Sequence, residues 1–206
     1  MTTDRSQYWD RHAKNYDRSV SLLCRSTPLV IELVEQRVAG AQLALEVGAG
    51  SGLFSTAIAP RVGQLVATDY SPGMIELLKT RIEASKLNNV RVVRADIYSL
   101  TFPLGSFDTV VAANVLHLVP DLAGAIAALR QMLRPGGRLI APTFCHDETP
   151  ISWTISRALA LTGFPGHRRF SAASLCSALE RLGLQIDHRQ LVRGLIPILY
   201  VDGRLP

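Results

Sequence analysis

Short apolar runs alternate with longer helical stretches along most of this chain of 206 residues. Runs typical of buried strands occupy residues 43–47, 65–68, 90–95, 107–113 and 138–144, and two more follow at 184–191 and 195–201. Helices are expected over 7–18, 28–38, 54–59, 122–133 and 175–182, and after the N-cap pair Ser71-Pro72. This alternation predicts a doubly wound α/β fold with a mostly parallel sheet of seven strands.

The last two apolar runs are joined by only a few residues around Arg193-Gly194. A parallel crossover needs a much longer connection, so these two strands must pair antiparallel. The sequence therefore predicts one antiparallel strand at the C-terminal end of the sheet.

Charge is distributed unevenly along the chain, which carries 22 Lys and Arg against 17 Asp and Glu, a net charge of +5. Residues 1–148 hold 15 basic and 14 acidic residues, whereas residues 149–206 hold 7 and 3. The only adjacent basic pair is Arg168-Arg169. Nucleic-acid binders usually cluster their charge, so this pattern argues against a nucleic-acid partner and leaves contact with a membrane surface open.

Three cysteines, Cys24, Cys145 and Cys176, are widely spaced and form no C-x-x-C motif. This spacing argues against a disulfide framework or a zinc knuckle and favours a reducing cytoplasm. The polar N-terminus does not resemble a signal peptide, and no segment approaches the ~20 apolar residues of a membrane span. We expect a cytoplasmic protein with no integral membrane segment and no metal site.

A glycine-rich loop, Gly48-Ala49-Gly50-Ser51-Gly52, follows the first core strand and precedes a helix. Such a loop lets a ligand approach the backbone and offers it free N–H groups. Asp69 ends the second strand, 21 residues after Gly48, and Asp96 ends the third. Because ligands of open α/β sheets bind at the carboxyl ends of the strands, Asp69 is placed to accept hydrogen bonds from ribose hydroxyls.

The glycine spacing is G-x-G-x-G rather than the G-x-G-x-x-G of dinucleotide folds, and Glu46 stands just before the loop. A carboxylate there would repel a phosphate and suit a cationic ligand. S-adenosylmethionine carries an ammonium, a sulfonium and a ribose but no phosphate. An NAD-dependent oxidoreductase is therefore the weaker alternative.

Four segments taken in order, Glu46-Val47-Gly48-Ala49-Gly50-Ser51-Gly52, Asp69, Ala95-Asp96 and Arg134-Pro135-Gly136-Gly137-Arg138-Leu139, resemble the motifs of class I S-adenosylmethionine-dependent methyltransferases. The chain is most similar to the small-molecule group that includes ubiquinone and menaquinone methyltransferases, and the resemblance covers roughly residues 8–144. It implies a Rossmann-like fold and S-adenosylhomocysteine as the product. The residues that would contact the cofactor are Tyr8, Tyr16, Glu46, Gly48, Ala49, Gly50, Gly52, Asp69, Tyr70, Met74, Asp96, Ile97, Asn114 and Val115.

The resemblance also implies a division of this single domain. Residues 1–40 would form an N-terminal helical lid and residues 41–144 the cofactor-binding core. Residues 145–170 would be a substrate-cap insertion, and residues 171–206 the last helix with the antiparallel strand pair.

Methyl transfer from a sulfonium is an in-line displacement in which the protein mainly aligns the reactants and excludes water. His117 and His146 follow strands four and five, so each is a candidate base or substrate contact. His167 favours a surface role. In the cap, Trp153, Phe164 and Arg168 are candidate substrate contacts, and the apolar composition suggests a small apolar or aromatic acceptor, methylated at O, N or S.

Other functions compete with this hypothesis. A phospholipid-headgroup or RNA methyltransferase would use the basic C-terminal quarter, and a non-catalytic cofactor-binding protein would share the cofactor motifs. Enzymes that methylate amino groups of DNA carry Pro-Pro after the Asn, but here Val115-Leu116 follows Asn114, and no Pro-Cys for a cytosine C5 enzyme occurs. Whether the protein is a monomer or a homodimer stays open.

Overall fold

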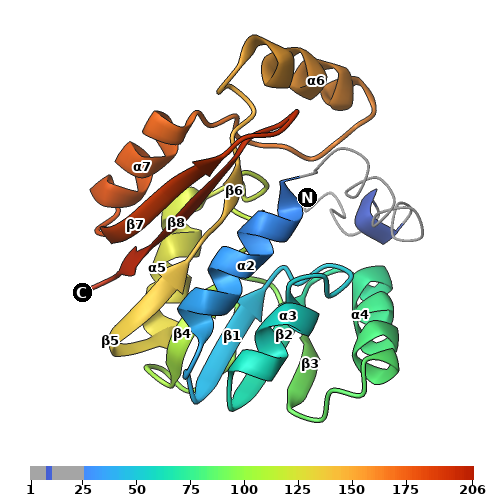
Figure 1. Cartoon of the computed structure of the whole chain (residues 1–206), viewed down its shortest axis with the longest axis vertical. Helices are drawn as coiled ribbons and strands as arrows, with labels where there is room; N and C mark the ends of the chain where they lie inside the picture. The colour runs from blue at the N-terminus through green and yellow to red at the C-terminus, as the bar shows by residue number, and fades with distance from the viewer. Residues whose placement is uncertain (1–7, 11–25) are drawn as a thin grey trace.

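The computed structural model describes residues 8–10 and 26–206 of the chain. Within these residues one sheet of eight strands runs in the order β3-β2-β1-β4-β5-β8-β6, and β7 pairs with β8 (Figure 1). Five neighbouring strands are parallel: β1 (Leu43–Val47), β2 (Gln64–Asp69), β3 (Val90–Arg94), β4 (Phe107–Val111) and β5 (Leu133–Ile140).

The strand β8 (Ile198–Arg204) runs antiparallel to β5, to β6 (Thr143–Phe144) and to β7 (Gln185–Val192). The predicted mostly parallel sheet with an antiparallel C-terminal strand is therefore confirmed. The predicted number of strands is wrong by one, because the run 138–144 is divided into β5 and β6. Pro142 lies at this division, where it has no N–H to donate to a ladder.

Helices cover both faces of the sheet (Figure 1). On one face lie α2 (Thr27–Val38), α3 (Ser55–Ile58) with the 3-10 turn η1 (Ala59–Arg61), and α4 (Pro72–Ala84). On the other face lie α5 (Leu122–Met132) and α7 (Ala172–Arg181). Consecutive strand residues alternate between the two cores, so that Ala44 packs with the first group and Leu45 with the second.

The helix α6 (Pro150–Leu161) stands apart from the two helix layers, beyond the end of the sheet (Figure 1). Its buried residues are Ser152 and Ser156, whereas Ile151, Trp153 and Leu161 are exposed. α6 therefore belongs to the segment that the sequence predicts as a cap.

Part of the predicted N-terminal lid belongs to the core. Val30, Val34 and Val38 of α2 are completely buried against the sheet. The expectation that all of residues 1–40 form a lid is therefore wrong for α2, whose valines recur on the face that packs on the sheet. Residues 8–10 are helical and lie elsewhere, as described below, and the rest of the predicted helix 7–18 lies outside the described residues.

A buried carboxylate connects α2 to the C-terminal strands. Asp202 of β8 is fully buried, and its Oδ1 accepts hydrogen bonds from the guanidinium groups of Arg37, at 2.9 Å, and Arg138. The Tyr200 hydroxyl donates to Asp202 Oδ2 at 3.0 Å. Two arginines and a hydroxyl thus supply this buried carboxylate with hydrogen-bond donors.

Two further expectations from the sequence concern membrane-spanning helices and the state of the cysteines. None of the helices in the described residues has the length and apolar character required to cross a membrane. Cys145 and Cys176 are free and buried, and Cys24 lies outside the described residues.

Candidate active site

A pocket opens at the carboxyl ends of β1 to β4, the edge of the sheet where the sequence predicts ligand binding. Trp9 from the N-terminal segment and Pro165 and His167 from the cap complete its wall. The lining residues from the sheet ends and their loops are Val47, Gly48, Gly50, Thr68, Asp69, Tyr70, Met74, Ala95, Asp96, Ile97, Tyr98, Ala113, Asn114, Val115, Leu118, Val119 and Pro120. Nine of the predicted site residues thus lie together, and all nine belong to the predicted cofactor contacts.

The glycine loop forms the floor of the pocket beside β4. Gly48 has φ of +62°, and a Cβ at this position would lie 2.5 Å from Val115 Cγ2. Gly50 has φ of +56°, and its N–H donates to Asp69 Oδ2 at 2.9 Å. Glycine is required at position 48 by both its conformation and the close approach of Val115.

Two predicted loop residues lie outside the pocket lining. The Ala49 N–H donates to the Thr68 carbonyl at 2.8 Å, which joins the loop to β2. A Cβ at Gly52 would lie 2.7 Å from Leu78 Cδ1 of α4, so this glycine allows a helix to pack closely. The prediction that Ala49 and Gly52 contact the ligand is therefore not supported by their positions, and both instead shape the loop.

Asp69 at the end of β2 connects the loops that surround the pocket. Its Oδ2 accepts from Gly50 N–H, and its Oδ1 accepts from Ser71 N–H, both at 2.9 Å. Burial raises the pKa of this carboxyl above its ordinary value, and the donated backbone hydrogen bonds oppose that rise. Asp69 therefore holds two loops in place while it faces the pocket.

Glu46 is buried beneath the glycine loop and does not line the pocket. Its carboxyl accepts a hydrogen bond from Ser55 Oγ at 2.5 Å. The pKa of Glu46 is raised to about 8, mainly by burial; the hydrogen bond from Ser55 opposes this rise and the nearby Asp69 adds to it. At neutral pH this group is largely protonated, so it is not the exposed carboxylate that the sequence suggests.

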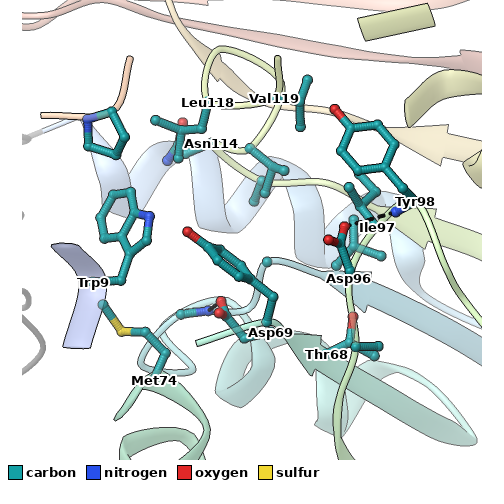
Figure 2. Close-up of a pocket in the computed structure, with 18 of the residues that line it drawn as sticks. Trp9, Thr68, Asp69, Met74, Asp96, Ile97, Tyr98, Asn114, Leu118 and Val119 are labelled. Carbon is teal, nitrogen blue, oxygen red and sulfur yellow. Dashed lines mark hydrogen bonds between the residues drawn. The ribbon is translucent and has the colours of Figure 1, made fainter. Parts of the chain in front are cut away.

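The two sides of the pocket differ in character. Figure 2 shows Trp9 and Met74 on one side and Ile97 and Tyr98 on the other, with Asp69 between them. Asp96 Oδ1 accepts from Tyr98 N–H at 3.0 Å, which fixes the loop after β3. The pocket is thus a slot between apolar side chains with carboxylates at its base.

Asn114 after β4 adopts an unusual conformation at the pocket wall. Its φ is +56°, and its N–H donates to the Pro142 carbonyl at 2.7 Å. The side-chain Oδ1 is buried and has no hydrogen-bond partner in the described part of the chain. A strained residue with an unpaired acceptor is typical of a ligand contact, because a buried orphan acceptor costs about 1–3 kcal/mol.

The N-terminal segment 8–10 is held at two places, by hydrogen bonds at the start of α4 and by aromatic contacts with Phe164. Asp10 Oδ1 accepts from Ser71 Oγ at 2.6 Å and from Gly73 N–H at 2.9 Å, at the start of α4. Trp9 lines the pocket, whereas Tyr8 packs edge-on against Trp9 and Phe164. Of the two predicted aromatic lid residues, Tyr8 therefore lies behind the lining, and Tyr16 lies outside the described residues.

The predicted catalytic histidines are buried next to each other but away from the pocket lining. His117 and His146 are 1% and 4% exposed, and their ring centroids are 5.3 Å apart. Burial lowers the pKa of His117 well below its ordinary value and the pKa of His146 to about 4, so both rings are neutral at pH 7. His167, which we expected at the surface, is exposed and also lines the pocket.

Comparison with known proteins identifies the family. Residues 45–141 match the family described as "Methyltransferase domain". A ubiquinone biosynthesis O-methyltransferase of Xanthomonas euvesicatoria pv. vesicatoria is 30% identical over 78% of this chain and 70% of its own length. The chain belongs to the methyltransferase family. The predicted resemblance is thereby confirmed.

The matches to other methyltransferases include different fractions of this chain. An uncharacterized chloroplastic methyltransferase of Arabidopsis thaliana is 37% identical over 55% of the chain, which spans only 34% of that protein. The crystal structure of the N-methyltransferase NodS from Bradyrhizobium japonicum in complex with S-adenosyl-l-homocysteine superposes with a TM-score of 0.76. It covers 98% of this chain and 100% of NodS at 21% identity, so the likeness establishes the fold.

Two predicted substrate contacts of the methyltransferase have other partners. The Arg168 guanidinium donates to the carbonyls of Val119 and, at 2.9 Å, Pro120, so it braces the loop after β4. Trp153 is 47% exposed on α6, where the Arg157 guanidinium lies 4.9 Å from its ring centroid. Neither side chain lines the pocket, and the prediction that they contact substrate is not supported by this geometry.

Sequence reasoning missed several lining residues. Trp9 adjoins a residue that was selected, and Tyr98 lies two residues after Asp96, so proximity to a motif was an available signal for both. Leu118 and Pro165 likewise follow the candidates His117 and Phe164, whereas Val119 and Pro120 carry no such signal, because folding alone brings the loop after β4 to the cap.

Proposed function

We propose that this chain is an S-adenosylmethionine-dependent methyltransferase that moves a methyl group to O, N or S of a small, apolar or aromatic acceptor by in-line displacement. The observation that carries the proposal is the juxtaposition of the glycine loop, Asp69 and the unpaired Asn114 Oδ1 around one slot. The O-methyltransferase relative supports a small-molecule acceptor.

The residues present fit the cofactor. Asn114 Oδ1 is a buried acceptor that an ammonium could satisfy, and Asp69 faces the slot as a hydrogen-bond acceptor for ribose hydroxyls. Tyr70, Met74 and Ile97 would flank the adenine, and Asp96 would accept from its amino group. When bound, the cofactor supplies a methyl group already activated on a sulfonium.

The chain's own contribution is orientation and exclusion of water. Gly48 and Val115 would fix the methionine end against β4, and Trp9, held by Asp10 at the start of α4, would close the slot from the N-terminal side. Positioning of this kind is worth up to about 7–11 kcal/mol for a reaction between two bound partners.

Calorimetry with S-adenosylmethionine and S-adenosylhomocysteine tests the proposal directly. We expect micromolar binding of both and no binding of NAD. Turnover on a panel of phenols, amines and thiols, followed by release of S-adenosylhomocysteine, distinguishes an enzyme from a cofactor-binding regulator. Absence of micromolar binding to either ligand would refute the proposal.

A further inference from the structure

The Phe164 side chain occupies the centre of a group of aromatic rings beside the pocket. Its ring centroid lies 6.0 Å from those of Tyr8 and Trp9 and 6.3 Å from those of His117 and His146. We refer to these four residues as the Phe164 cage. Because Trp9 also lines the pocket, the cage adjoins the proposed cofactor slot.

The cage contains polar atoms that Phe164 cannot satisfy. Both ring nitrogens of His146 and the Nδ1 of His117 are buried without a hydrogen-bond partner in the described part of the chain. Unpaired buried polar atoms are costly, and a phenyl ring offers no partner to them. A ligand with its own polar group would fit this space better than the side chain that now fills it.

The chemistry of the cage restricts that ligand. The four side chains of the cage carry no carboxylate, and next to His146 the charge of Arg169 opposes that of the exposed Asp147, so a cationic amine would have no buried counter-ion there. A neutral imidazole has one donor and one acceptor nitrogen, and a hydroxyl group both donates and accepts. The favoured ligand is therefore a neutral aromatic ring with a hydroxyl group.

His146, with both ring nitrogens unpaired, is the better partner for that hydroxyl, and the spacing of the rings allows it. The His146 ring is tilted by 51° to the Phe164 ring, whereas the His117 ring is nearly parallel to it, at 17°. A hydroxyl on a ring at the Phe164 position, directed across the 6.3 Å between these two centroids, would come within reach of a hydrogen bond of about 2.7–3.0 Å to His146.

We expect the segment that carries Phe164 to move without unfolding of the cap. α6 ends at Leu161, and Gly163 has φ of +79° with open space around its Cβ position. Downstream, the N–H groups of His167 and Arg168 donate to the His117 carbonyl at 3.1 and 3.0 Å. Residues 162–166 therefore form a short loop between two fixed ends.

We propose that the space filled by Phe164 is the acceptor subsite, and that it takes a single hydroxylated aromatic ring whose hydroxyl pairs with His146 when Phe164 swings out. This rests on the proposed function, since the ring would lie beside the cofactor slot.

Titration of the full chain with phenol, followed by NMR of the histidine and phenylalanine rings, tests the subsite. Fluorobenzene is the matched probe, because it has the same ring without a hydroxyl. We expect phenol to bind about tenfold more tightly than fluorobenzene, the scale of one net hydrogen bond, and to shift the His146 signals. Phe164→Ala should bind phenol more tightly than the parent chain, because no side chain has to leave.

Two variants complete the experiment. His146→Phe should remove the preference for phenol over fluorobenzene, and Leu161→Ala, at an exposed position before the same loop, should change neither affinity. Equal affinity of the parent chain for the two probes, or weaker phenol binding by Phe164→Ala, would overturn the proposal even if His146→Phe failed to fold.

Calorimetry with S-adenosylhomocysteine on the same samples separates this inference from the proposed function. Binding of that ligand without any preference for phenol refutes only the acceptor subsite. Absence of that binding, with the preference for phenol present, refutes the proposed function and leaves a phenol site that is not an acceptor subsite.

Discussion

The Asp10 carboxylate accepts a hydrogen bond from the Ser71 hydroxyl, with 2.6 Å between the two oxygens. Ser71 is also the N-cap of α4, and its N–H donates to Asp69. The N-terminal segment is therefore joined through one serine to the carboxylate that faces the ribose position of the proposed cofactor.

Replacing Asp10 should weaken cofactor binding, although Asp10 does not line the pocket. Asp10→Ala removes two hydrogen bonds that hold residues 8–10 at α4, so Trp9 would no longer close the slot. We expect calorimetry to report a dissociation constant for S-adenosylhomocysteine about tenfold higher, or about 1.4 kcal/mol. Glu76→Ala, an exposed change on the same helix, is the control, and an Asp10→Ala variant that binds like this control would contradict the prediction.

Asp69→Ala should affect both binding and stability. The change removes the acceptor for ribose hydroxyls, which we expect to cost about 1.5–3 kcal/mol of binding free energy. It also leaves the N–H groups of Gly50 and Ser71 without their acceptor, so urea unfolding should show a loss of about 1–3 kcal/mol. Asp96→Ala, at an exposed position, should weaken binding with little loss of stability; equal stability losses in the two variants would count against this division.

The stability of the chain should fall between pH 6.5 and 8 because of Glu46. Its pKa is about 8 in the folded state and about 4.5 in the unfolded chain, so the folded state binds more protons between these values. Over 1.5 pH units the loss is on the order of 2 kcal/mol, at about 1.4 kcal/mol per unit. The depressed pKa values of His117 and His146 act with the opposite sign, but at lower pH, below about 6.5.

Urea unfolding at several pH values checks this expectation. Glu46→Gln keeps the shape and the hydrogen bond from Ser55 but does not titrate, so its stability should be flat across the same range. A parallel decline in both proteins would assign the pH dependence to other groups.

Asp202→Ala should destabilise the fold more than any exposed change. The change removes the fully buried carboxylate that pairs with Arg37 and Arg138. We expect the free energy of unfolding to fall by about 3 kcal/mol. This is the low end for a broken buried ion pair, because the Arg37 side chain is 38% exposed. Asp187→Ala removes ion pairs that are closer to solvent, and we expect less than about 1 kcal/mol there. Thermal and urea unfolding of the two variants provide the comparison.

The parts of the site that the sequence predicted well are those fixed by local geometry. Ligands of open α/β sheets bind at the carboxyl ends of the strands. Gly48 and Gly50 follow the end of β1, and Asp69 is the last residue of β2, so this rule predicts the positions of all three in the pocket lining. Ser71-Pro72 predicts the start of α4 because an N-cap acts within one turn. These features require no knowledge of distant contacts.

Predictions that depended on tertiary contacts were less accurate. Arg168 looked like a substrate contact, but the loop after β4 supplies carbonyls that only the folded chain brings near it. Residues 27–38 were grouped with the lid, although their valines belong to a core built with later strands such as β1, β2 and β8. His117 and His146 were selected for their position after strands, which does not reveal that their rings are buried beside Phe164.

The position of β8 has a consequence for synthesis of the chain. β8 follows β7 in sequence but lies between β7 and β5, and it pairs with both. During translation, β7 therefore emerges from the ribosome before the strand that will join it to the sheet, and β5 keeps an open edge until residues 198–204 have been made. A nascent chain stalled ahead of these residues should expose that edge to chaperones. Arg37 and Arg138 are also synthesised before Asp202, the buried carboxylate with which both pair.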